Sequence, residues 1–189
     1  MKRKILLLAS ALMLTAGCIV GYTRSTKSDN DQTLKQEQRE ERHIAREKAR
    51  AQRLAEYERS VDSMVLARSF RFNPTTMQQQ PAGSPRLLTN PAFLLSVWDS
   101  VVDVCLPFIK GVTPPYYTVI LNYTLPSVTM YTTEQTREGW LVTFSSTLFS
   151  ATQYNFSLEI YSSSGSATLT ISTSWYPDVQ YSGSITGLN

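Results

Sequence analysis

The composition of the chain changes abruptly at Ser69, and this change limits the folds open to it. Residues 32–68 are dominated by Glu, Gln, Arg, Lys and Ala and contain no Gly or Pro. These residue types are strong helix formers. From residue 69 onward Ser, Thr, Val and aromatic residues dominate, and eight of the ten tyrosines lie there. That composition is typical of β-strands. The sequence therefore predicts one long charged helix followed by a β domain.

Alternation of apolar and polar residues runs through most of the β region. Tyr154, Phe156, Leu158 and Ile160 alternate with polar neighbours, and residues 116–125, 140–148 and 167–172 show the same period. This period of two is typical of antiparallel strands with one buried and one wet face. No helical period lies between them, which argues against parallel crossovers. We expect a mainly β fold, a single antiparallel domain built as a curled meander sheet or a small sandwich, preceded by the long charged helix.

Shorter apolar runs predict further strands over residues 93–98, 101–106, 128–133 and 179–185. Residues 69–73 predict a first strand that stops at Pro74, because proline cannot donate a ladder hydrogen bond. Residues 75–90 are rich in proline, glycine and polar side chains and predict a loop. Asp99 and Ser100 predict a tight turn between two strands.

The helix changes character along its length. Its first half carries few large aliphatic side chains, which predicts a solvated stalk. From about residue 51, Leu54, Tyr57, Val61 and Met64 recur at steps of three and four, so one face becomes apolar and is expected to dock on the β domain. These positions fill barely two heptads, fewer than a coiled coil needs. We expect a monomer, with oligomerisation through the helix as the alternative.

The first eighteen residues resemble a bacterial lipoprotein signal. Residues 2–4 are basic and residues 5–14 are apolar, a run too short to span a bilayer, which takes about 20 apolar residues. Leu14-Thr15-Ala16-Gly17-Cys18 resembles a lipobox, although Thr15 stands where leucine is usual. The resemblance implies that the thiol of Cys18 is lipidated and anchors the chain to a membrane. The alternative is an ordinary signal peptide cut near Gly17.

Four segments follow from these patterns: a signal peptide over residues 1–17, a flexible tether over 18–31, a charged helical stalk over 32–68 and the β domain over 69–189. Removing the signal leaves 15 basic and 15 acidic residues. A neutral mature chain gives no support to nucleic-acid binding. Ile19 is not a retention aspartate, and no acidic export signal follows. We expect the periplasmic face of the outer membrane, with surface exposure as the alternative.

Catalytic and metal-binding patterns are lacking in the sequence. The single histidine, His43, lies in the charged helix, so the β domain cannot form a Ser-His or Cys-His pair. We expect no enzyme activity, no metal and no cofactor. Cys105 lies in an apolar stretch and is expected to be a small buried residue, with a reactive thiol as the alternative. If lipid occupies Cys18, no disulfide forms within the chain.

Aromatic residues at strand ends are the candidate binding residues. Tyr116 and Tyr117 follow two prolines, and Trp175 and Tyr176 precede Pro177. Tyr and Trp favour sites that are apolar on one side and wet on the other. They predict a site for a small glycan, lipid or peptide, unless they serve as cross-strand pairs and core. The simpler expectation is an envelope lipoprotein that presents its β domain to a protein partner or serves as a scaffold.

Several local motifs resemble a family of uncharacterised lipoproteins from Bacteroides-type bacteria, a domain of unknown function (DUF4251). The similarity spans residues 40–186. It rests on Asp99-Ser100-Val101, on Leu106-Pro107-Phe108 with Gly111, on residues 140–144 and 165–167, and on the closing Tyr181-Ser182-Gly183-Ser184-Ile185. The sequence departs from the family pattern at residues 108–111. The resemblance implies an envelope location and a β fold, and it brings no activity or cofactor.

Two tripeptides, Asp62-Ser63-Met64 and Asp99-Ser100-Val101, resemble the O-glycosylation sequon of such bacteria. Each serine is more simply explained as a helix or turn residue.

Overall fold

The computed structural model describes residues 25–99, 101–111, 117–126, 128–147 and 152–188. The chain divides into two compact units, residues 1–48 and 49–189. The predicted signal peptide and Cys18 therefore lie outside the described residues. None of the described helices is long and apolar enough to cross a membrane.

A single helix, α1 (Ser25–Leu66), runs through the first unit into the second. In the first unit its side chains from residue 34 to residue 48 are exposed, as predicted for a stalk. His43 is a surface residue there, with its Nδ1 atom 3.4 Å from a carboxylate oxygen of Glu47 one turn along the helix.

The start of α1 corrects the predicted tether. A flexible segment was expected over residues 18–31, but residues 25–31 are helical. The last glycine before the helix is Gly21, and no glycine or proline follows until Pro74. Once a helix has formed, each added residue gains a hydrogen bond, so polar residues of moderate propensity join it in the absence of a breaker.

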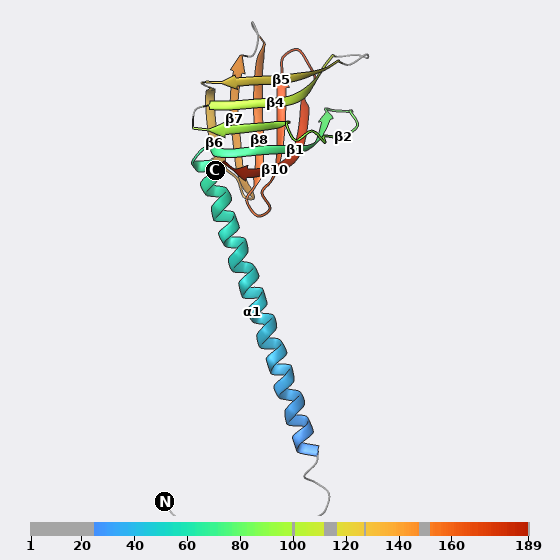
Figure 1. The fold of residues 1–189 in the computed structure, drawn as a ribbon, viewed down its shortest axis with the longest axis vertical. Helices are drawn as coiled ribbons and strands as arrows, with labels where there is room; N and C mark the ends of the chain where they lie inside the picture. The colour runs from blue at the N-terminus through green and yellow to red at the C-terminus, as the bar shows by residue number, and fades with distance from the viewer. Residues whose placement is uncertain (1–24, 100, 112–116, 127, 148–151, 189) are drawn as a thin grey trace, which may run out of the picture. The chain divides into compact units, whose positions relative to one another are not determined.

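The second unit contains the end of α1 and ten strands (Figure 1). Their bounds are β1 (Ser69–Gln79), β2 (Arg86–Leu87), β3 (Leu94–Trp98), β4 (Val101–Lys110), β5 (Tyr117–Leu125), β6 (Thr129–Gln135), β7 (Gly139–Thr147), β8 (Gln153–Tyr161), β9 (Ser166–Thr173) and β10 (Val179–Gly187).

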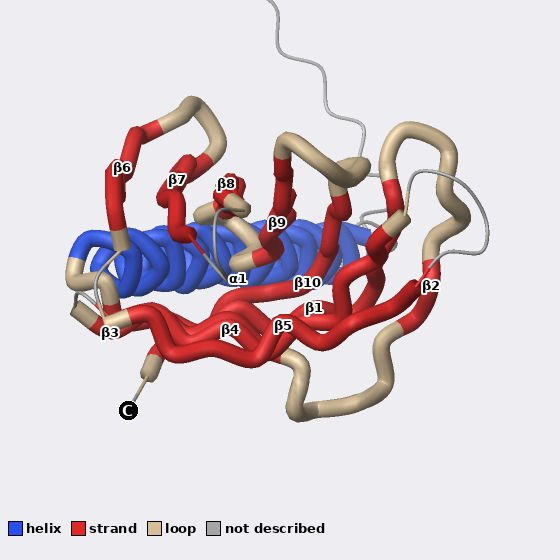
Figure 2. Tube along the Cα trace, turned by 90° about the horizontal axis from the view of Figure 1, so that it is seen from above, coloured by secondary structure: helices blue, strands red, loops and turns tan. Residues whose placement is uncertain are grey.

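All strand pairs are antiparallel, in the order β5-β4-β3-β1-β10-β9-β8-β7-β6, with β2 attached to β1. The mainly β, antiparallel fold is thus confirmed. The sheet is not one continuous meander, however. Two meanders meet where the first and last long strands pair, with Phe70 opposite Gly187 and Gln79 opposite Val179. Figure 2 shows β3, β4 and β5 on one side and β6 to β9 on the other, joined by β10 and β1.

The chain connection from β5 to β6 explains why the sheet curls into a half-barrel. These two strands end the strand order on opposite sides, yet only residues 126–128 separate them in sequence. Consecutive Cα atoms are about 3.8 Å apart, so the joined strand ends lie within about 15 Å of each other. A flat sheet of nine neighbouring strands would be more than twice as wide, at about 4.8 Å per strand.

The concave face of the curled sheet holds the core, as the alternation predicted. The alternate residues of β8 and β9 are buried, and so are those of β4 from Val102 to Phe108. Phe144 stacks on Phe156 with ring centroids 4.6 Å apart, and Phe108 meets Tyr154 edge to face at 5.7 Å. The contact of Phe108 with Tyr154 joins strands from both meanders into one core.

The first strand runs past Pro74, contrary to prediction. β1 continues to Gln79, and its register with β10 shifts between Pro74 and Thr76. A bulge leaves one residue out of the ladder and so accommodates a proline that cannot donate. Gly183 lies opposite, where a Cβ atom would collide with the carbonyl oxygen of Asn73. The predicted loop over residues 75–90 is therefore partly strand.

The last turns of α1 close one end of the half-barrel, which we call the helix-closed end. Val61 and Val65 are fully buried, so the predicted docking is confirmed for the last turns of α1, whereas Leu54 and Tyr57 of the same predicted face remain exposed. Between them Asp62 accepts hydrogen bonds from the Trp140 indole at 2.7 Å and from the Ser162 hydroxyl at 2.9 Å.

One further bond fixes the helix at this end, where the Tyr57 hydroxyl donates to the Ser164 carbonyl at 3.3 Å. The next residue, Gly165, has a φ of 64°, and a Cβ atom there would collide with the Tyr57 hydroxyl. The turn after β8 therefore needs glycine both for its backbone conformation and for the approach of the helix.

Cys105 differs from its prediction as a buried residue. It is a free, half-buried thiol. It alternates with the core residues Val104 and Leu106, so the strand period turns it toward the convex, wetter face. The apolar residues around Cys105 lie on both faces of β4. The apolar composition of this stretch therefore predicted a buried position that the strand geometry does not give.

Candidate functional site

The end of the half-barrel opposite the helix holds a group of aromatic residues around one lysine. β1 starts at the helix-closed end, and β4 runs parallel to it, so Lys110 at the end of β4 lies near the far end of β1. The Gln79 side chain, which donates to the Gly111 carbonyl at 3.5 Å, places both strand ends together. We call this group the Lys110 cluster; it comprises Lys110, Tyr117, Tyr154, Trp175 and Tyr176.

Strand pairing and a short loop bring the members of the Lys110 cluster together. Lys110 ends β4 and pairs with Tyr117, the first residue of β5, so both side chains leave the sheet on one face. Tyr154 opens β8 from the opposite meander. Tyr176 lies in the loop between β9 and β10, where its backbone N–H donates to the Thr173 hydroxyl at 2.9 Å.

The lysine is the centre of the contacts. Its ammonium nitrogen lies 5.6 Å from the centroid of the Tyr176 ring, within cation–π range, and it also donates a hydrogen bond to the Tyr154 hydroxyl. Tyr176 in turn meets Phe108 edge to face at 6.5 Å. Core aromatic packing therefore continues outward through Phe108 to a charged group at the end of the strands.

The Tyr154 hydroxyl stays protonated at neutral pH. Burial raises the pKa of Tyr154, while the nearby Lys110 ammonium acts in the opposite direction. Burial also raises the pKa of Tyr123. A neutral phenol is both a hydrogen-bond donor and an acceptor. The cluster therefore offers one positive charge, neutral hydroxyls and aromatic faces, which suits recognition of a polar ligand better than proton transfer.

The sequence-predicted binding residues meet different outcomes. Tyr116 lies outside the described residues. Tyr117 and Trp175 are 65% and 69% exposed, whereas Tyr176 is half-buried against Phe108. The structure thus brings Tyr117 and Tyr176 to the same lysine. Sequence reasoning missed Lys110 and Tyr154, because the lysine lay beyond the strand predicted over residues 101–106 and the tyrosine lay in a row of core residues.

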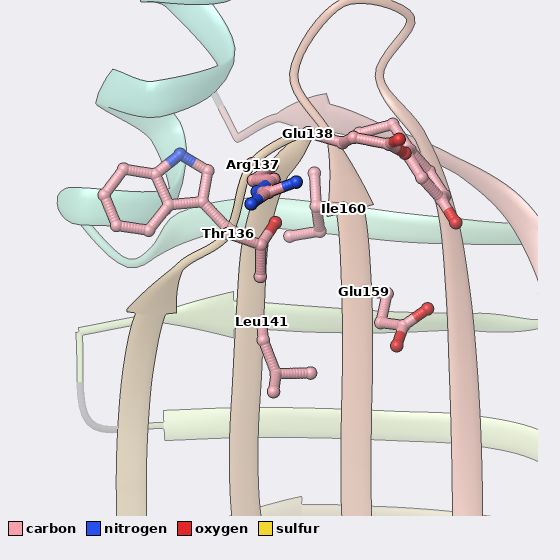
Figure 3. A pocket seen from close by; sticks show the side chains of 8 residues that line it. Thr136, Arg137, Glu138, Leu141, Glu159 and Ile160 are labelled. Atoms are coloured by element: carbon pink, nitrogen blue, oxygen red, sulfur yellow. The ribbon is translucent and has the colours of Figure 1, made fainter.

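A second candidate region surrounds the turn between β6 and β7. Cavities of about 270 Å³ and about 400 Å³ flank this turn. Both are lined by Thr136, Arg137, Glu138 and Tyr161. Figure 3 shows Thr136 and Arg137 together on one side of Ile160, with the carboxylates of Glu138 and Glu159 on the other.

The charged side chains of this turn are better explained as solvated surface groups than as catalytic groups. Arg137, Glu138 and Glu159 are all exposed, so water and salt screen their interactions. Among the residues that the structure describes, no group of three His, Cys, Asp or Glu side chains could hold a metal ion.

Asp99, predicted to form the tight turn, and nearby Asp103 lie at different places in the sheet. Asp99 has a φ of 55° and its N–H donates to the Arg68 carbonyl at 3.0 Å, so it is a turn residue as expected. Asp103 pairs across the ladder with Ser96, on the convex face. Of the two sequon serines, Ser63 is exposed on α1 and Ser100 lies outside the described residues.

The family model of a domain of unknown function, DUF4251, matches residues 52–185. This chain belongs to the DUF4251 family. The resemblance noted in the sequence is therefore confirmed. The match begins within the apolar part of α1, so the DUF4251 domain includes the docked helix as well as the sheet.

A solved structure supports the fold of the DUF4251 domain. The chain is similar to the crystal structure of a DUF4251 family protein from Bacteroides eggerthii DSM 20697, with 17% sequence identity and a TM-score of 0.54, over 69% of this chain and 87% of that one. A likeness at this identity shows the fold alone. A comparison with the curated proteins finds no match, and the family match indicates no catalytic family.

Proposed function

We propose that this protein is a lipid-anchored envelope protein whose DUF4251 domain presents an interaction surface to a protein partner or serves as a scaffold, without catalysis. The basic start, the apolar run and the lipobox-like residues ending at Cys18 support the anchor. One acyl chain gives only marginal binding, so a stable anchor of this kind carries several chains. The neutral mature chain does not need charge to stay at the membrane. We place it at the outer membrane, facing the periplasm.

The Lys110 cluster is the observation that carries the interaction role. Tyr117 and Trp175 leave most of their surface to solvent, although each would gain by burial. Exposed aromatics near a partly satisfied cation form the kind of surface that partners bury, since Tyr and Trp dominate binding hot spots. At the helix-closed end, by contrast, the Trp140 side chain is buried and bonded to Asp62.

The ionisation of the domain supports a role without catalysis. The side chains whose pKa values shift clearly among the described residues are tyrosines, and burial raises each of them: Tyr123, Tyr131, Tyr154 and Tyr181. A general acid or base works best with a pKa near the operating pH. These shifts move the hydroxyls further from neutrality.

The second candidate function is binding of a small glycan, lipid or peptide at the same cluster. The Lys110 ammonium and the Tyr176 hydroxyl favour it, because they could orient a polar ligand against aromatic faces. Such a ligand would stack on Tyr117 or Trp175, whose rings are exposed. Both functions use one surface and differ in what covers it.

The anchor is tested by labelling. Cells that express the full chain and a Cys18→Ala variant are fed an alkyne-bearing fatty acid. We expect label and membrane fractionation for the native chain only. A Cys105→Ala variant is the matched control and should keep both. Equal labelling of native and Cys18→Ala chains would reject the anchor, and protease treatment of intact cells would separate the two faces of the membrane.

The interaction role is tested by native mass spectrometry of the full chain purified from its envelope. Added mass of protein size supports a protein partner, and added mass of a few hundred daltons supports the small ligand. Either mass should be lost in a Trp175→Ser variant and kept in Leu87→Ser, whose side chain is also exposed but lies on β2. A bare chain in every preparation would leave only the scaffold role.

A further inference from the structure

The two end strands of the sheet differ in how their free edges are protected. Sheet edges invite pairing with other chains, and proteins block this with charge, proline or bulges. β6 carries such protection: its register with β7 shifts between Thr129 and Thr132, Met130 has a φ of 53°, and Glu134 adds charge. β6 is therefore a poor template for another strand.

β5 lacks all three protections. Its nine residues contain no charged side chain and no proline. Its register with β4 is continuous from Val102 opposite Leu125 to Lys110 opposite Tyr117. Among the described strands, β4 is its only neighbour, and Figure 1 shows β5 as the outermost of the strands that lie beside β4. β5 is thus a long, regular edge with its outer side available for pairing.

Exposure along β5 agrees with an available edge. Tyr117, Thr118, Ile120, Asn122 and Thr124 are exposed, and Ile120 leaves 56% of its surface to solvent. Proteins normally place a charged residue in the middle of a free sheet edge, where it blocks pairing with other chains. β5 has an exposed isoleucine at that position. The strand is therefore suited to covering by another strand rather than to remaining in water.

We propose that β5 pairs with β5 of a second copy of this chain, antiparallel about a two-fold axis at Leu121. This register overlaps all nine residues and keeps concave-face residues on one side of the joined sheets. It brings together side chains that stabilise antiparallel pairs, since aromatic–β-branched and Thr–Thr pairs are favourable. The facing pairs are Tyr117 with Leu125, Thr118 with Thr124, Val119 with Tyr123, and Ile120 with Asn122.

The absence of charge selects a second copy over other partners. With the two-fold axis at Leu121, a lysine or glutamate near the centre of the strand would lie opposite or diagonally across from its own counterpart, close enough for the like charges to repel. The described β5 residues carry none. The pairing shares Tyr117 with the Lys110 cluster but needs neither the lipid anchor nor a ligand at that cluster, and its failure would leave both proposals standing.

The oligomeric state of the mature chain, residues 18–189, tests the proposal. Light scattering after size exclusion, in reducing buffer and over a range of concentrations, should give a dimer. Ile120→Lys should weaken the association at least about tenfold, because both copies lose the pair with Asn122 and gain lysines that lie diagonally across the two-fold axis from each other. Thr124→Lys is the second variant, and circular dichroism checks that each variant folds.

Leu54→Lys is the control, because Leu54 is also an exposed aliphatic residue but lies on α1. A dimer that persists in Ile120→Lys and Thr124→Lys but dissociates in Leu54→Lys would show pairing through the helix and overturn the proposal. A monomer at every concentration would overturn it as well. Hydrogen exchange gives an independent measure: amides of residues 117–125 should exchange more slowly as dimer forms, and unchanged exchange there would contradict β5 pairing.

Discussion

The two ends of the half-barrel are finished with different kinds of contact. At the helix-closed end, Val61 and Val65 are buried, and Asp62 is shared between the Trp140 indole and the Ser162 hydroxyl. At the other end, the Lys110 cluster leaves Tyr117 and Trp175 exposed. The comparison teaches that polar groups are used differently in the two places: Asp62 is bonded within the fold, whereas the Lys110 cluster leaves two aromatic side chains in solvent, which is the basis of our proposal.

Val65→Asp should have the largest effect, because it places a charge where α1 closes the sheet. Val65 is fully buried, and burying an unpaired carboxylate should lower the free energy of unfolding by more than about 4 kcal/mol. Urea unfolding measures the loss. Leu66→Asp is the matched control: Leu66 is 64% exposed, and its change should stay within about 0.5 kcal/mol. Equal effects would show that the helix does not close this end.

Asp62→Ala should follow, since it removes the acceptor for two hydrogen bonds. The Trp140 indole, only 9% exposed, would lose its partner. We expect a loss of about 2 kcal/mol in the free energy of unfolding. Asp62→Asn keeps an acceptor oxygen and should recover part of it. If both variants matched the native chain, this end would be held by apolar packing alone.

Alkaline pH should weaken the fold through Tyr181, which links the two meanders. Its hydroxyl donates to the Pro107 carbonyl at 2.7 Å, and burial raises its pKa far above the usual 10.0. Above pH 10.0 the unfolded chain loses this proton while the folded chain keeps it. The free energy of unfolding therefore falls as pH rises, by up to about 1.4 kcal/mol per pH unit.

Tyr181→Phe removes this titration. It should cost about 1 kcal/mol at neutral pH, through the lost hydrogen bond, and flatten the decline between about pH 10 and 11. Unfolding curves at several pH values measure both effects. A decline as steep as in the native chain would assign the alkaline sensitivity to the other buried tyrosines.

Trp175→Ala should have the smallest effect on stability, because its side chain is 69% exposed. We expect a change within about 0.5 kcal/mol. Tyr176→Ala is the comparison: its ring contacts Phe108 and Lys110, so its loss should cost more, about 1 kcal/mol or above. A larger loss for Trp175 than for Tyr176 would mean that the exposed aromatics of the Lys110 cluster are structural after all.

Local sequence patterns predicted the strands well where they alternate. β8, with Tyr154, Phe156, Leu158 and Ile160 buried, lies where the period of two placed it. β1 was cut short because proline normally ends a strand, and only the bulge opposite Gly183 lets it continue. The order of the strands in the sheet could not be predicted from local patterns. The alternation of apolar and polar residues in 69–79 does not specify that this strand pairs with residues 179–187.

The candidate site was predicted in part for the same reason. Exposed Tyr117 and Trp175 lie at strand ends, a position visible in the sequence as nearby prolines. Lys110 and Tyr154 belong to different meanders, and only the curl of the sheet brings them together. A contact between residues of different meanders cannot be predicted from the composition of either meander alone.

The pairing of β1 with β10 has a consequence for the order of events during synthesis. Phe70 and its partner Gly187 are 117 positions apart, and pairs of such separation slow folding because a long loop must close first. The two meanders therefore stay unjoined until the last strand has been made. That delay keeps the half-barrel from closing while the chain emerges, which suits the export across a membrane that we propose for it.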